Sequence, residues 1–179
     1  MDRHNPYEAA FAEFLRERHV CHVAVDESRR SFHGEELVKS VDFIVTSSGG
    51  KWVVDVKGRR YPGGPPEHPR RVWENWTTRS DVLHSQQWAK RFGEDFQALF
   101  VFMYQLTQAE IMPGEDDTYW AWHGNSYLLR ALPVAVYAQH MRRRSPKWDT
   151  VCLPQARFLE LAHPLHVYVP ETEFEVVGQ

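Results

Sequence analysis

The sequence predicts an α/β fold with a mixed central sheet flanked by helices, and it leaves an α+β arrangement open as the alternative. The first supporting observation is the order of apolar patterns, which runs helix, three strands, helix, strand, and then more of both. The second is composition, because 42% hydrophobic and 25% charged residues are typical of a globular protein. The length of 179 residues suits a single domain, residues 1–179, and no internal repeat or heptad run is found.

The first predicted element is a helix from Pro6 to about Arg18. Asn5 is a favourable cap, and proline is well tolerated at the first helical position. The spacing of the apolar residues places one stripe of the helix against the core, formed by Tyr7, Phe11, Phe14 and Leu15.

Three strands are predicted next. They cover residues 20–25, 37–45 and 51–57. The short, glycine-rich turn at residues 46–50 predicts that the second and third strands pair as an antiparallel hairpin. A Pro/Gly-rich surface loop then follows at residues 61–69.

Helices and strands continue to the end of the chain. We expect a helix at residues 81–92, capped by Ser80 or Asp81, and an apolar strand at 98–106. The remaining expectations are strand segments within 119–132 that turn near Gly124, a helix at 133–143, a strand at 148–153, a helix at 154–162, and an edge strand or extended arm at 164–179.

Several classes of protein are disfavoured by the sequence. No stretch approaches the roughly 20 apolar residues of a membrane-spanning helix, and residues 1–6 lack the apolar part of a signal peptide, so we expect a cytoplasmic protein. Cys21 and Cys152 form no Cys-x-x-Cys pair that would indicate zinc or redox chemistry. The net charge of −3 means that binding to nucleic acid would depend on local basic clusters.

The predicted hairpin carries the candidate chemistry. Asp55 and Lys57 project from the same face of an otherwise apolar strand. A two-residue or four-residue turn pairs positions whose numbers sum to 97, which places Asp42 opposite Asp55. Opposed carboxylates repel unless a positive charge lies between them, and Mg²⁺ favours such oxygen ligands. Lys57 could then orient or deprotonate the attacking water, or stabilise charge on phosphate.

A third carboxylate is available from the first helix. Glu8 borders the buried stripe of that helix, whereas Glu13 and Glu17 face water. Glu8 is therefore the helix acid that we expect at the site. Each feature also has a structural interpretation, namely an ion pair inside the hairpin for Asp55 and Lys57 and a favourable helix-dipole contact for Glu8.

Glu8, Asp42 and the run Asp55-Val56-Lys57 resemble the signature of the PD-(D/E)XK nuclease-like superfamily, which includes archaeal Holliday-junction resolvases and restriction endonucleases. The resemblance covers about residues 5–106, with Val41 in place of the proline, and leaves 107–179 as a C-terminal elaboration. It implies a restriction-endonuclease-like core and Mg²⁺-dependent hydrolysis of phosphodiester bonds, in which Mn²⁺ can substitute. The acids would bind metal and Lys57 would assist the nucleophile.

Two further features belong to this resemblance. In some members a glutamine on the following helix lies near the site; Gln86 and Gln87 match, and we prefer Gln86 as the residue that positions Lys57 or the phosphate. Separately, the segment 7–11 resembles the N-terminal motif of an uncharacterised planctomycete group called HYExAFE, which adds no known activity.

Basic residues flank the predicted site. The loop cluster contains Arg59, Arg60, Arg70 and Arg71, interleaved with Tyr61, Trp73 and Trp76, a combination that suits a phosphate backbone and unpaired bases. A second cluster at 142–147 is expected at a helix C-terminus, where the helix dipole already explains it and binding to nucleic acid is the alternative.

The predicted substrate is nucleic acid. We expect DNA, although no sequence feature separates DNA from RNA. A symmetric homodimer would suit a resolvase-like enzyme. The alternatives are a catalytically inactive module of the same fold that binds nucleic acid, and a protein-interaction domain in which Asp55 and Lys57 merely pair.

Overall fold

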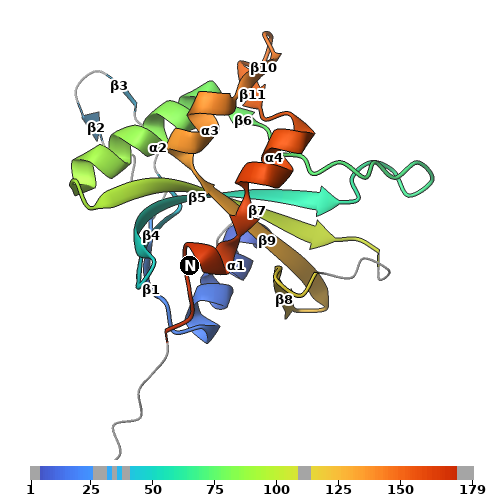
Figure 1. Cartoon of the computed structure of the whole chain (residues 1–179), viewed down its shortest axis with the longest axis horizontal. Helices are drawn as coiled ribbons and strands as arrows, with labels where there is room; N and C mark the ends of the chain where they lie inside the picture. Colours follow the sequence, from blue (N-terminus) through green and yellow to red (C-terminus); the bar gives the residue numbers. More distant parts are fainter. Residues whose placement is uncertain (1–4, 26–31, 34–35, 38–40, 109–113, 173–179) are drawn as a thin grey trace, which may run out of the picture.

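The computed structural model describes residues 5–25, 32–33, 36–37, 41–108 and 114–172, and it shows a mixed sheet with helices on both faces (Figure 1). This confirms the predicted fold class. The sheet of the described residues has seven strands in the order β1-β4-β5-β7-β9-β12, with β8 paired to β9. Their bounds are β1 Cys21–Ala24, β4 Phe43–Ser47, β5 Gly50–Tyr61, β7 Phe96–Leu106, β8 Thr118–Trp122, β9 Asn125–Pro133 and β12 His163–Pro164.

The pairing directions follow from the connections. β1, β4 and β5 are successive antiparallel neighbours, whereas β5 and β7 are parallel. A parallel pair needs a crossover, which here contains helix α2, Arg79–Phe92. β9 then returns antiparallel to β7. Two short strands, β2 Phe32–His33 and β3 Glu36–Leu37, form a separate pair.

Each face of the sheet has its own core. Helix α1, Pro6–Glu17, packs Phe11, Phe14 and Leu15 against one face, which includes Val54 and Val56 of β5. The opposite face is covered by α2, α3 Val134–His140 and α4 Gln155–Leu161 (Figure 1). Its core contains Val53, Val82, Phe100, Phe102, Tyr137 and Phe158.

Helix α1 begins as predicted and lies very close to β5. The Asn5 side chain caps it by accepting from the Tyr7 N–H, with Pro6 at the first helical position. Tyr7 packs on Gly58, where a Cβ atom would lie only 2.2 Å from ring carbons of Tyr7. Glycine at position 58 therefore sets the distance between α1 and the strand that carries Asp55 and Lys57.

Two predictions about helix ends are wrong. Helix α2 begins at Arg79 with Thr78 as its cap, because Thr78 and Asp81 form a capping box. Helix α3 ends at His140, and the arginines predicted to complete it form strand β10, Arg142–Ser145. That strand pairs with β11, Thr150–Cys152, which also pairs with β6, Thr77–Thr78. Strand pairing therefore determines the conformation of this basic segment.

The described part of the C-terminal segment contains little regular secondary structure. After β12, a 3₁₀ turn covers Leu165–Val167, and the predicted arm beyond 172 lies outside the described residues. None of the described helices is both long and apolar enough to cross a membrane.

Candidate functional site

The β4–β5 hairpin has the predicted register. Phe43 pairs with Val54 and Ser47 pairs with Gly50, so the turn has two residues and the paired numbers sum to 97. The next pair in this register would be Asp42 with Asp55. The ladder ends at Phe43, however, and the Asp42 N–H donates to the Val54 carbonyl at 3.0 Å.

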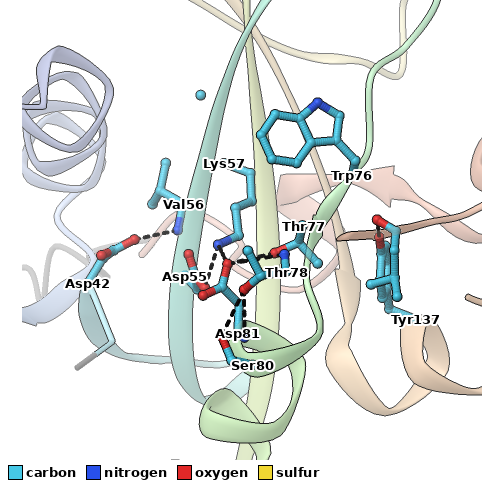
Figure 2. Close-up of polar contacts among 12 residues, drawn as sticks. Asp42, Asp55, Val56, Lys57, Trp76, Thr77, Thr78, Ser80, Asp81 and Tyr137 are labelled. Atoms are coloured by element: carbon cyan, nitrogen blue, oxygen red, sulfur yellow. Dashed lines mark hydrogen bonds and ion pairs between the residues drawn. The ribbon is translucent and has the colours of Figure 1, made fainter. Parts of the chain in front are cut away.

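The Asp42 carboxylate takes part in the sheet itself. In the hairpin register Val56 would pair with Val41, but its N–H donates to Oδ2 of Asp42 at 2.7 Å (Figure 2). Asp42 is only 7% exposed. The end of the ladder therefore places a buried carboxylate beside β5.

Asp42 lies in an environment that disfavours its charge. Burial raises the pKa of Asp42 well above its usual 3.8, and the neighbouring carboxylates of Asp55 and Glu8 raise it further. The Val56 N–H and the Lys57 ammonium lower the pKa, but by less. Three predicted site residues, from α1, the residue before β4, and β5, thus interact electrostatically.

Glu8 is oriented by the residue that caps its helix. The Asn5 amide donates through Nδ2 to Oε1 of Glu8 at 2.6 Å, while its Oδ1 accepts from the Tyr7 N–H at 3.1 Å. The Tyr7 hydroxyl donates to the Arg59 carbonyl at 3.2 Å, which ties the same turn of α1 to β5. Sequence reasoning identified Asn5 as a cap but missed its contact with Glu8.

Lys57 is held between two carboxylates. Its Nζ lies 2.8 Å from Oδ2 of Asp55 and 2.8 Å from Oδ2 of Asp81, and the residue is 8% exposed. In Figure 2, Asp55 lies between Asp42 on one side and Lys57 with Asp81 on the other. The predicted ion pair between Asp55 and Lys57 therefore exists, and it extends to a third residue.

Asp81 also belongs to this site, although the sequence predicted only a helix-capping role for it. Its Oδ2 also accepts from Thr77 Oγ1 at 2.9 Å and from the Thr78 N–H at 3.4 Å. It is buried at the start of α2, directly beside Lys57. The spacing Thr78-x-x-Asp81 is a capping-box signal that could have placed this carboxylate, but nothing local indicated its contact with Lys57.

Gln86 lies further along α2. It lines a hollow of about 370 Å³ together with Ala89, Lys90 and, from the neighbouring elements, Ala98 and Pro133. Its predicted role in positioning Lys57 or phosphate stays a prediction.

The predicted binding arginines differ in what they contact. Arg59 donates to the Gly58 and Trp76 carbonyls, and its guanidinium lies 4.3 Å from the centroid of the Trp76 ring. Arg60 and Arg71 are exposed, and Arg71 donates to Gln108 at 3.3 Å. Arg70 is exposed as well and pairs with Glu74 at 3.4 Å. Arg60, Arg70 and Arg71 therefore face solvent, whereas Arg59 supports the segment around Trp76.

The aromatic residues of the loop cluster pack mainly on protein. Tyr61 and Trp73 stack with their ring centroids 3.6 Å apart, and Trp73 also contacts Tyr104 edge-on. These two rings border the core beneath α2 and α4. The structure thus gives Tyr61 and Trp73 a packing role.

The donor atoms suit a hard divalent cation. Mg²⁺ is commonly bound through one or two carboxylates and keeps several waters, and Asp42 and Asp55 supply such oxygens. Within the described residues, no group of three or more His, Cys, Asp or Glu side chains is arranged to hold a metal ion. The fit therefore rests on Asp42 and Asp55, with Glu8 as an electrostatic neighbour of Asp42.

Comparisons with known proteins give little support for a family. No family model and no curated protein matches the chain. Among solved structures, Hjc, a Holliday junction resolvase from the archaeal hyperthermophile Archaeoglobus fulgidus, is similar over 88% of this chain and 93% of that chain. The identity is 11% and the TM-score 0.47. A likeness of this size is too weak to assign a function.

Proposed function

We propose that this protein is a metal-dependent nuclease that hydrolyses phosphodiester bonds. One observation carries the proposal: Asp42, at the end of the β4–β5 ladder, is buried against β5 beside Asp55, and Asp55 itself contacts Lys57 at 2.8 Å. Two acids and a lysine lie together there, one from the residue before β4 and two from β5. Burying such charges is costly, and this kind of arrangement is concentrated at functional sites.

Asp42 and Asp55 are the residues that would hold Mg²⁺, or Mn²⁺ in its place, with Glu8 assisting. A bound divalent cation would lower the pKa of a water molecule and neutralise charge on the phosphate. The protein's own contribution is a cluster of carboxylates, because Asp55 and Asp81 hold Lys57 while Asp55 and Glu8 act electrostatically on Asp42.

The contacts of Lys57 favour one of its two predicted roles. Both carboxylates that hold Nζ stabilise the charged ammonium, and a charged donor suits the phosphate oxygens better than it suits proton abstraction. We therefore assign Lys57 to charge stabilisation. Asp81 acts as a positioning residue, because it fixes Nζ from the side opposite Asp42.

The second candidate is a catalytically inactive module that binds nucleic acid. It is favoured by the network of Lys57 with Asp55 and Asp81, which satisfies the lysine without a metal. This candidate predicts salt-sensitive binding without metal-dependent cleavage. A protein-interaction domain would show neither.

Calorimetric titration of Mn²⁺ and Mg²⁺ tests the proposal without any assumption about the substrate. We expect binding by the wild type and loss of binding by Asp55→Ala. Asp95→Ala is the matched control, because Asp95 is an exposed aspartate paired with Lys51. If the wild type binds neither ion, alone or with a short oligonucleotide present, the proposal fails.

Cleavage assays then address the chemistry. Candidate substrates are plasmid DNA, single-stranded DNA, four-way junctions and RNA, each with Mg²⁺ or with EDTA. We expect Asp55→Asn to reduce the rate by at least about a hundredfold, the order seen when one charge-stabilising group is removed. Activity that survives in EDTA or in Asp55→Asn would contradict the assignment. Sedimentation of the same samples would test the predicted homodimer.

A further inference from the structure

The β10–β11 hairpin is a strongly basic surface that the proposed site does not use. Within eight residues, 142–149, it carries four cations and one carboxylate, in a protein of net charge −3. Figure 1 shows the hairpin projecting beyond α3 at one end of the molecule. Its cations are all exposed: Arg142, Arg143, Arg144 and Lys147.

An exposed tryptophan lies in the turn of this hairpin. Trp148 is 68% exposed, the largest exposed fraction among the exposed large apolar side chains of the described residues. The Lys147 ammonium lies 5.2 Å from the centroid of its ring. An aromatic face next to a cation is the arrangement with which proteins stack an unpaired base and bind its phosphate.

A hollow of about 210 Å³ lies beside the hairpin. Arg70 and Arg144 contribute cations to it, and Trp76 forms part of its wall. The Arg144 guanidinium is 5.2 Å from the centroid of the Trp76 ring. Glu74, which pairs with Arg70, is the carboxylate among the lining residues. The hollow is therefore cationic, as a phosphate site requires.

The same surface is connected to Lys57 through the small three-stranded sheet. β11 pairs with β6 through Thr150 with Thr78 and Val151 with Thr77. Thr77 and Thr78 in turn donate to the Asp81 carboxylate that holds Lys57. Trp76, which precedes them, contacts Arg59, and Arg59 lies two residues after Lys57 on β5. A strand bound along the hairpin and the hollow would thus approach the proposed site.

We infer that the β10–β11 hairpin and the hollow beside it bind a single-stranded segment of nucleic acid. Phosphates contact Arg142, Arg143 and Lys147, and an unpaired base stacks on Trp148. The inference rests on the proposed function, since it specifies the substrate of that site. An acidic protein segment could use the charge alone, but it would leave the exposed indole unused.

Fluorescence anisotropy with labelled oligonucleotides in EDTA tests the inference, because no metal-dependent cleavage can occur. The test variant replaces Arg142, Arg143 and Lys147 by serine. The control replaces three cations exposed elsewhere, Arg16, Lys51 and Arg157, each of which pairs with an acid. We expect the hairpin variant to bind at least tenfold more weakly than the control, with a salt slope smaller by about 2. Equal affinities, or no binding by the wild type, would overturn the inference.

Stacking is tested separately with Trp148→Ala. We expect at least a fivefold loss of affinity for single-stranded DNA or RNA and no loss for duplex DNA. Leu159→Ala, at another exposed apolar residue, is the control. Equal effects on single strands and duplex would overturn the assignment to an unpaired base. Displacement by polyglutamate as effective as by unlabelled oligonucleotide would overturn nucleic acid as the ligand. Comparison of the affinities for single-stranded DNA and for RNA of the same sequence shows which nucleic acid this surface prefers.

Calorimetry of the hairpin variant separates the two proposals. Because the hairpin cations do not contact Asp42 or Asp55, we expect metal binding and thermal midpoint to match the wild type. Loss of oligonucleotide binding with metal binding retained supports the inference. If the wild type binds oligonucleotide through the hairpin but binds no metal, the proposed nuclease fails while the binding surface stands.

Discussion

The two sides of the candidate site differ in how well their charges are compensated. On the carboxylate side, burial and the nearby Asp55 and Glu8 raise the pKa of Asp42. On the lysine side, Lys57 is matched by Asp55 and Asp81, and Asp81 also accepts from Thr77. The fold therefore stabilises the lysine side by itself, whereas the carboxylate side gains when a cation binds. This difference indicates where a ligand would act.

The largest expected effect comes from removing the central cation. Lys57→Met leaves the carboxylates of Asp55 and Asp81 without their shared ammonium partner. Breaking a buried ion pair in this way costs about 3–5 kcal/mol of unfolding free energy. Lys51→Met, on the same strand but at an exposed pair, should cost less than about 1 kcal/mol. Urea denaturation at pH 7.5 in EDTA measures both. Equal losses of unfolding free energy in the two variants would mean that the ion pairs of Lys57 stabilise the fold no more than the exposed pair of Lys51 does.

A bound divalent cation should compensate the charge of Asp42 and Asp55, as Lys57 already compensates that of Asp81. If Asp42 and Asp55 bind Mn²⁺, a concentration of 100 times the dissociation constant stabilises the wild type by about 2.7 kcal/mol. The shift in thermal midpoint should grow as pH rises, because metal binding requires the deprotonated Asp42 carboxylate. Differential scanning fluorimetry of wild type and Asp42→Asn checks this. A similar shift in both proteins would place the cation elsewhere.

Replacing Asp42 by the uncharged asparagine should raise the thermal midpoint by several degrees at pH 8 without metal, because it removes a buried charge beside Asp55. The pKa of Asp42 is raised in the folded state, so its stabilising contribution is complete below about its usual 3.8 and is lost as pH rises through the folded value. Asp42→Asn cannot show this loss, and its amide oxygen can still accept from Val56. The advantage of the variant should therefore grow from pH 4 to pH 8. A constant difference across this range would show that Asp42 does not titrate as described.

The smallest effect concerns the orientation of Glu8. Asn5→Ala removes a helix cap and should cost about 1 kcal/mol in urea denaturation. Asn5→Asp keeps a capping oxygen but loses the donor to Glu8, so it should retain most stability while changing Mn²⁺ affinity. If Asn5→Asp is as unstable as Asn5→Ala, capping is not the main contribution of this residue.

Local chemistry made several elements predictable. Asn5-Pro6 marks the start of α1, because a cap and a proline both favour that position. The two-residue turn before Gly50 determines the register of β4 with β5, which runs from Ser47 with Gly50 to Phe43 with Val54. The period of two places Asp55 and Lys57 on one face of β5. These features depend on neighbours in sequence, which is why the fold class and the contact of Asp55 with Lys57 could be predicted.

Contacts between distant segments decided the rest. The Asp42 carboxylate accepts from Val56 only because the ladder ends at Phe43, and Asp81 reaches Lys57 only because the α2 crossover starts beside β5. Pairing with β11 makes Arg142–Arg144 a strand instead of a helix end. The sequence alone therefore determined which residues share a turn or a strand face, through local sterics and hydrogen bonding. The tertiary structure decided which charges meet, because burial and pairing depend on segments far apart in the chain.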